Sequence, residues 1–134
     1  MIQFLLIWSD WGILLVRVVL GLILMGHGLP KLKNLKAAGE NFQSMGFKPG
    51  PFWGTLVALL EVFGGLALIL GFLTQIFAAF VVIEFIVILS TIKRKSGFVG
   101  GYELDLLILA VAVLLVFVGS GSVSIDNMLG LLIF

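Results

Sequence analysis

The chain has 134 residues, of which 61% are hydrophobic and 11% are charged, and its formal net charge is +1. This balance is typical of a polytopic membrane protein and gives no reason to expect a nucleic-acid partner. The absence of cysteine and the single histidine argue against a thiolate zinc site, an iron–sulfur cluster or a multi-histidine metal site, so we expect no metal.

The apolar runs predict one domain, residues 1–134, that crosses a membrane four times. We place the spans at about residues 11–28, 52–72, 74–92 and 102–118, because a crossing needs about 20 apolar residues. Pro30 is expected to end the first span, since proline disfavours helix at the residue before it. The sequence therefore predicts an all-α integral membrane protein, an antiparallel bundle of four transmembrane helices.

The polar stretch between the first two spans has a helical pattern of its own. Apolar residues recur at helical spacing at Leu35, Ala38, Phe42 and Met45. This pattern predicts a short amphipathic helix at the membrane interface, with an ordinary loop as the alternative. The last residues, 129–134, are apolar but too few to span again, and we expect them to pack on the membrane surface.

The basic residues indicate how the chain is oriented. Four crossings place loops 29–51 and 93–101 on the same side, and these loops hold every basic residue except Arg17: Lys31, Lys33, Lys36, Lys48, Lys93, Arg94 and Lys95. The positive-inside rule then predicts a multi-pass protein of the cell membrane with cytoplasmic basic loops and both termini outside.

Ionisable residues within the spans are the candidate functional residues. Glu61 and Glu84 fall near the membrane midplane, and a carboxylate there costs roughly 2.5–3.5 kcal/mol to insert. Arg17, in the first span, is the expected counter-ion of Glu61. Because two carboxylates then face one cation, we expect Glu84 to carry an exchangeable proton. A buried ion pair that only holds the helices together is the alternative.

Small residues lie one turn from these charges. Gly21 follows Arg17, and Gly64 and Gly65 follow Glu61. Such spacing favours close helix packing, and a flat ligand slot against bare backbone is the second interpretation. Six residues thus form one predicted ligand-binding or buried polar cluster: Arg17, Gly21, Glu61, Gly64, Gly65 and Glu84.

A second polar cluster is predicted at the inner edge of the bundle. His27 ends the first span at the level where Glu103 and Asp105 begin the fourth. Because Glu103 and Asp105 are two residues apart on a helix, only one is expected to face the core, and we favour Glu103. His27 then either bonds to Glu103 or a loop carbonyl, or donates a proton to a ligand.

Several short motifs resemble the DoxX family, in order and over nearly the whole chain. They are Arg17-x3-Gly21, His27-Gly28-x2-Lys31-Leu32, Phe42-x3-Gly46, Glu61-x2-Gly64-Gly65, Leu70-Gly71-x2-Thr74 and Gly119-x-Gly121-x2-Ser124-Ile125-Asp126. The resemblance implies a four-helix membrane protein. It also implies a link to sulfur oxidation, in which a membrane subunit passes electrons from thiosulfate to quinone, or to membrane-associated oxidative-stress complexes. The shared site would include Arg17, Gly21, Glu61, Gly64 and Gly65, whereas the lack of cysteine argues against sulfur transfer by this chain itself.

The main functional hypothesis is a quinone- or small-ligand-binding subunit of a membrane redox complex. Its expected partners are membrane lipid and redox proteins, and quinone is the expected ligand. Two alternatives are a scaffolding subunit without a ligand, and a small transporter or channel component, which would need a homo-oligomer because four helices are few for a pore.

Overall fold

The computed structural model describes residues 2–92 and 96–130, which are mostly helical and include no strand. The helices are α1 (Ile2–Leu6), α2 (Ser9–Lys33), α3 (Leu35–Ser44), α4 (Gly50–Leu70), α5 (Thr74–Val87), α6 (Glu103–Val118) and α7 (Ile125–Leu129). A π-helical turn, η1 (Ile88–Ile92), extends α5. The segment η2 (Phe98–Tyr102) precedes α6 and is kinked, with non-helical backbone angles at Val99 and Gly100. Four stretches are long and apolar enough to cross a membrane, which confirms the predicted all-α, four-span fold: 9–33, 50–70, 74–91 and 98–118.

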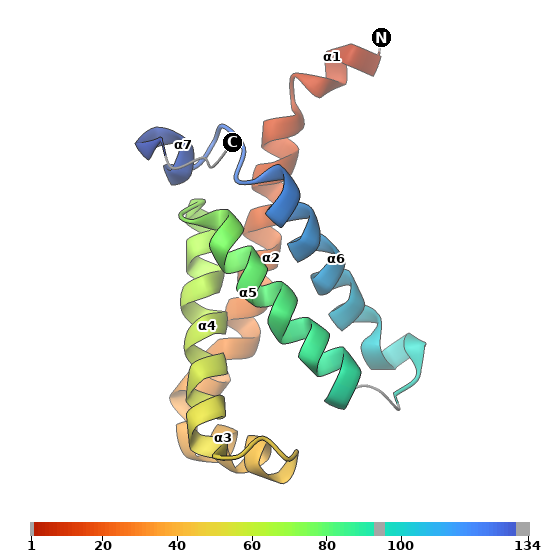
Figure 1. Cartoon of the computed structure of the whole chain (residues 1–134). Coiled ribbons are helices and arrows are strands. Elements are labelled where there is room, and N and C mark those ends of the chain that lie inside the picture. Colours follow the sequence, from red (N-terminus) through yellow and green to blue (C-terminus); the bar gives the residue numbers. More distant parts are fainter. Residues whose placement is uncertain (1, 93–95, 131–134) are drawn as a thin grey trace.

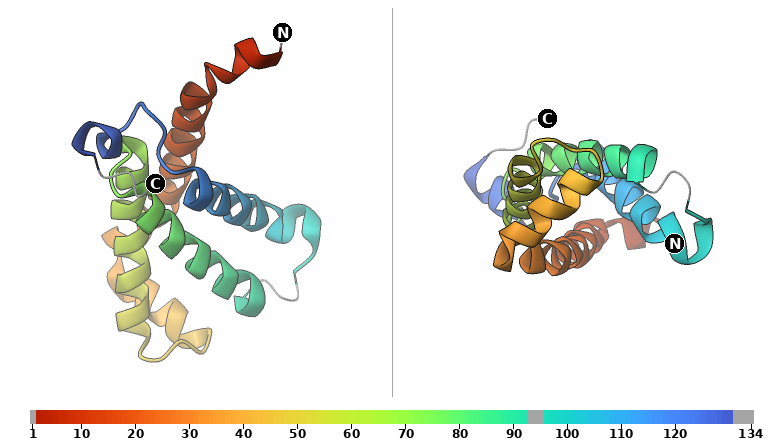
Figure 2. Two further views of the ribbon diagram at one scale, coloured as in Figure 1. Left: turned by 45° about the horizontal axis from the view of Figure 1, so that its top comes forward. Right: turned by 90° about the horizontal axis from the view of Figure 1, so that it is seen from below.

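The helices form two pairs that meet at one end of the molecule. α2 packs along α4 over most of its length, and α5 packs along α6. In Figures 1 and 2 the α5–α6 pair leans away from the α2–α4 pair towards the end that carries α3. α1 and α7 lie at the opposite end. We refer to these two ends as the α3 end and the α7 end.

The helix boundaries differ from the predicted ones mainly around Pro30. The first span does not end before this proline, as we expected; α2 continues to Lys33 with Pro30 inside it. A proline within a helix removes the hydrogen bond to the carbonyl four residues earlier and crowds that carbonyl; here that residue is Gly26, which is exposed. The chain turns at Asn34, whose side chain accepts a hydrogen bond from the Ala37 amide at 3.2 Å and so caps α3.

The apolar core lies towards the α7 end. Its fully buried members come from all four long helices: Leu20, Leu24, Leu68, Ala78, Val81, Phe85, Ile108, Ala112 and Leu115. Most other large apolar side chains are exposed, as expected for a surface that faces lipid. The predicted roles of Lys93, Arg94, Lys95 and of the tail residues 131–134 lie outside the described residues.

Candidate functional site

The central ion pair joins Glu61 of α4 to Lys31 near the end of α2. The Lys31 ammonium donates to both Glu61 carboxylate oxygens, at 2.9 and 2.7 Å. The Glu61 side chain is 2% exposed and that of Lys31 32% exposed. Gly28 permits the approach, because a β-carbon there would lie 2.7 Å from the Glu61 β-carbon. The counter-ion of Glu61 is therefore Lys31, which we had assigned to a basic loop.

Glu84 brings a second carboxyl group to the same place from α5. It is 9% exposed, and its electrostatic neighbours are Glu61 and Lys31. It interacts directly with the Glu61 carboxyl group, and no hydrogen-bond donor among the described residues reaches either of its buried oxygens. Two buried carboxyl groups thus share one cation. We call Lys31, Glu61 and Glu84 the acidic triad.

The predicted pair between Arg17 and Glu61 is wrong. Arg17 is 1% exposed and donates hydrogen bonds to backbone carbonyls. Its Nε donates to Leu68 at 2.9 Å. One terminal nitrogen donates to Ser120 and also to Val123, the latter at 3.0 Å. The antiparallel packing of α2 and α4 explains why Arg17 does not reach Glu61. Arg17 faces the C-terminal end of α4, and Leu68 lies about 10 Å beyond Glu61 along the helix axis at 1.5 Å per residue.

Around Arg17, a buried polar cluster closes the α7 end. The Asp126 carboxylate accepts hydrogen bonds from the Leu73 amide at 2.6 Å and the Thr74 amide at 2.9 Å, and the Asp126 amide donates to the Gly71 carbonyl at 2.8 Å. Asp126 is also the carboxylate that interacts electrostatically with Arg17. This role was missed from the sequence because Asp126 lies outside every predicted span.

The glycines act in packing, as one of the two interpretations predicted. A β-carbon on Gly65 would lie 2.6 Å from the Gly21 carbonyl oxygen, and one on Gly64 would lie 3.5 Å from the Phe77 ring. The Gly65 face is thus filled by α2 and the Gly64 face by α5. The alternative of a flat ligand slot against these glycines is not accommodated.

Replacing Gly21 with alanine is expected to destabilise the fold by about 1–3 kcal/mol, the usual cost of overpacking. The new methyl group would lie 2.6 Å from Ile69 Cγ1 and would also meet the Gly65 carbonyl. Gly26→Ala is a matched control on the same helix, because nothing lies within 4 Å of its β-carbon position. Thermal unfolding in detergent measures both. Equal stability of the two variants would contradict the close contact.

The predicted inner-edge cluster of His27, Glu103 and Asp105 does not form as expected. His27 is exposed, Glu103 is exposed and Asp105 is half-buried. Glu103 instead accepts a hydrogen bond from the Gly100 amide at 3.1 Å, and no bond between it and His27 occurs within 2–92 and 96–130. Neither acid of α6 is buried, so the prediction that Glu103 faces the core was wrong. α6 leans away from α2 at this end (Figure 1).

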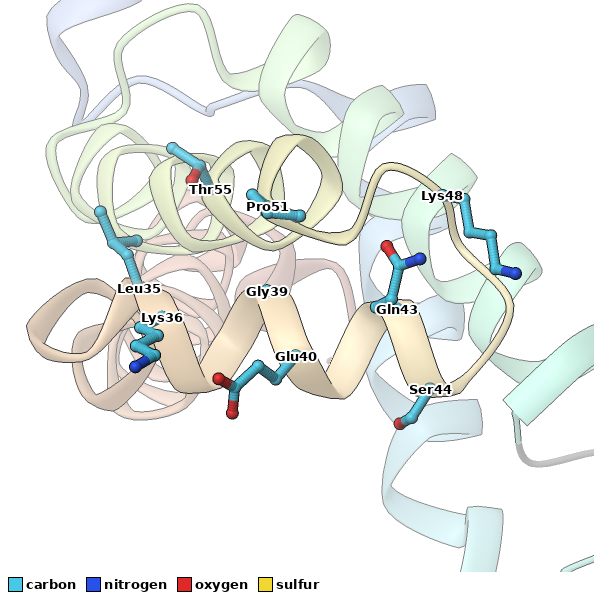
Figure 3. A pocket seen from close by; sticks show the side chains of 9 residues that line it. All are labelled: Leu35, Lys36, Gly39, Glu40, Gln43, Ser44, Lys48, Pro51 and Thr55. Atoms are coloured by element: carbon cyan, nitrogen blue, oxygen red, sulfur yellow. The ribbon is translucent and has the colours of Figure 1, made fainter.

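A shallow pocket lies between α3 and the start of α4, away from the acidic triad. Figure 3 shows the side chains that line it: Leu35, Lys36, Gly39, Glu40, Gln43, Ser44, Lys48, Pro51 and Thr55. Lys36, Glu40 and Ser44 point away from α4 in this view, and Gln43 is held by the Gly50 amide at 2.7 Å. The polar groups of the pocket do not converge, so we do not place the ligand site here.

Comparison with known proteins identifies the family. The family model DoxX matches residues 12–94, more than half of the chain. The chain belongs to the DoxX family. It is 31% identical over 115 residues to the Bacillus subtilis (strain 168) protein named "Putative oxidoreductase CatD", an alignment that covers 86% of this chain and 84% of that protein.

A second relative of this DoxX-family protein comes from Escherichia coli (strain K12). It is named "Inner membrane protein YqjF" and is 32% identical over 126 residues, which cover 90% of this chain and 94% of that protein. No solved structure matches the chain significantly. All three members of the acidic triad fall within the residues that match the DoxX model, and this chain is accordingly a multi-pass membrane protein.

Proposed function

We propose that this DoxX-family protein is a membrane subunit of a redox system and that it binds the head group of a quinone beside Glu84. The observation that carries the proposal is the Glu84 carboxyl group, which no described hydrogen-bond donor reaches and which is buried next to an ion pair that already neutralises one negative charge. Ionisable groups within a span are costly, and they mark ligand or proton sites by default.

The burial pattern of α5 supports access to Glu84 from the edge of the core. The buried residues of α5 end with Glu84 and Phe85, whereas Ile86 and Val87 are exposed. Glu84 thus lies near the end of the buried part of α5. An apolar ligand dissolved in the membrane would reach this edge without crossing the packed core. The edge replaces the Gly64–Gly65 face as the proposed location.

The chemistry of the triad fits a quinone, whose reduction requires protons as well as electrons. A protonated Glu84 would donate a hydrogen bond to a ligand carbonyl and supply a proton to it. Lys31 would hold Glu61 in its charged form through their two hydrogen bonds. The name of the Bacillus subtilis relative, which includes the word oxidoreductase, supports a redox role.

Glu84→Leu is expected to stabilise the protein by about 1–3 kcal/mol, because it removes a second buried carboxyl group that no described hydrogen-bond donor reaches. Glu40→Gln, on the exposed side of α3, should leave stability unchanged. Thermal unfolding of both variants in the same detergent provides the measurement. A loss of stability in Glu84→Leu would mean that this carboxyl group supports the fold, and it would favour the scaffolding alternative.

Quinone binding itself is tested with a short-tailed ubiquinone added to the protein in nanodiscs. We expect the ligand to raise the unfolding temperature of wild type and Glu84→Gln, whose amide still donates a hydrogen bond, but not of Glu84→Leu. The unfolding temperature is measured separately with inorganic thiosulfate in place of the ubiquinone. An equal rise in wild type and Glu84→Leu would exclude Glu84 as the binding group.

A further inference from the structure

The acidic triad has one closed side. Between it and the α7 end, Leu20, Leu24, Leu68 and Val81 are at most 3% exposed. The backbones of α2 and α4 meet there at Gly21 and Gly65, with no room for a side chain.

Beyond this apolar layer the polar cluster around Arg17 is itself sealed. Thr74, Ser120, Ser124 and Asp126 are each at most 8% exposed. The hydrogen bonds of Arg17 and Asp126 tie this cluster to the ends of α4 and α5. A water path from the α7 end to Glu84 would have to break both layers.

The other side of the triad is open through Lys31. Its side chain is 32% exposed, whereas that of Glu61 is 2% exposed. Lys31 lies on the last turn of α2, at the α3 end, and its ammonium group reaches inward to Glu61. On the same side, none of the described residues of α6 before Ile108 is buried. One polar side chain therefore connects the buried carboxyl groups to the surface at the α3 end.

We propose that the acidic triad exchanges protons with the α3 end of the bundle only, with Lys31 as the positioning residue at its entrance. The inference rests on the proposed function, because it concerns the same site, and it defines the side from which that site takes its protons. The charged groups that interact with Glu84 are Glu61 on α4 and Lys31 on α2. The two acids of α6, Glu103 and Asp105, lie on its first turn, before its buried part.

A one-sided proton site also bears on the transporter alternative. Transport across the membrane would require the triad to face each end in turn, through the apolar layer and the Gly21–Gly65 contact. Exchange at the α3 end alone instead suits a subunit that delivers protons to a bound ligand.

The test uses dicyclohexylcarbodiimide, which dissolves in the bilayer and reacts with protonated carboxyl groups. Its adduct on Glu84 is measured by mass spectrometry in sealed right-side-out and inverted membrane vesicles that contain the full chain. The pH is raised on one side of the membrane at a time. A membrane-impermeant cationic carbodiimide identifies the outward-facing end of each preparation, because Glu40 is exposed on α3 and Asp10 lies at the start of α2.

We expect alkaline pH to suppress the Glu84 adduct only when it is applied on the side where Glu40 is modified. Suppression from the Asp10 side, or equally from both sides, would overturn the proposal. An adduct that forms at no pH would also overturn it, because the site would then hold no exchangeable proton. Binding of the short-tailed ubiquinone in nanodiscs does not depend on sidedness, so the two proposals can fail separately.

Lys31→Met tests the entrance, with Lys33→Met as its matched control. Both variants lose a lysine from the last turn of α2, but among the described residues only Lys31 pairs with Glu61. We expect Lys31→Met to slow the response of the Glu84 adduct to a pH step on the α3 side, and Lys33→Met to respond as wild type does. Lys31→Arg keeps the charge and the ion pair and should respond nearly as fast. A response as slow as that of Lys31→Met would contradict the role of a cation at this entrance. Equal rates in Lys31→Met and wild type would contradict the role of Lys31.

Discussion

Replacing Arg17 with leucine is expected to lower the free energy of unfolding by about 3–5 kcal/mol, the usual cost of breaking a buried polar interaction on one side only. The guanidinium group donates to the carbonyls of Leu68, Ser120 and Val123. Each carbonyl that loses its donor in a buried site costs about 1–3 kcal/mol. Asp126 would lose its electrostatic partner as well.

The position of these carbonyls explains why the effect should be large. Leu68 lies in the last turn of α4, whereas Ser120 and Val123 lie in the segment that leads from α6 to α7. A single side chain of α2 therefore joins two parts of the chain that are more than 50 residues away from it. Without it, the α7 end should loosen before the rest of the bundle.

Arg17→Lys distinguishes the effect of the positive charge from the effect of the guanidinium geometry. Lysine keeps the positive charge but has one nitrogen, so it cannot donate to carbonyls on both sides as the planar guanidinium group does. We expect it to recover only part of the lost stability. Detergent unfolding followed by tryptophan fluorescence gives the free energies, and Arg17→Leu with wild-type stability would show that the carbonyls find other donors.

The fold was predictable because the sequence features that indicate each helix lie within that helix. Each span is an apolar run of sufficient length, and Leu35, Ala38, Phe42 and Met45 carry the helical pattern of α3. Pro30 was the exception. Its effect depends on whether the surroundings of Gly26 tolerate a free carbonyl, and that is a property of the packed structure.

The pairing of the buried charges was not predictable to the same degree. Depth alone placed Arg17 near Glu61, but a long side chain can point either way along its helix, and here Arg17 points to the α7 end and Lys31 to the core. Lys31 sits beside a predicted helix end, where lysine normally extends towards water. Gly28, three residues earlier, was the signal for close approach, and the motif His27-Gly28-x2-Lys31 contained both residues.

The imbalance between carboxyl groups and cations survived this correction. Two carboxyl groups against one cation were expected from the sequence, and the structure retains that count with Lys31 in place of Arg17. Composition within the spans is visible in the sequence, whereas the partner of each charge depends on the relative register of α2 and α4. The number of buried charges was therefore predicted correctly, whereas the partner of each charge was not.

Lys31→Met is the second change for which we expect a large loss, again about 3–5 kcal/mol, because it leaves the Glu61 carboxylate buried without its cation. Lys33→Met, two residues later and exposed, should change stability by no more than about 0.5 kcal/mol. The double variant Lys31→Met/Glu61→Met replaces the whole pair with apolar side chains and should return to within about 1 kcal/mol of wild type.

The four unfolding free energies of wild type, Lys31→Met, Glu61→Met and the double variant form a thermodynamic cycle. Lys31→Met leaves the Glu61 carboxylate buried, whereas the partly exposed Lys31 of Glu61→Met can extend to the surface. The cycle should therefore give a coupling energy of at least about 2 kcal/mol, in the upper range for residues in contact. Additive losses would mean that Lys31 and Glu61 do not interact in the membrane. Glu84 would then be the only carboxyl group that Lys31 could neutralise, and the proposed division between a fixed pair and a proton-carrying acid would have to be reversed.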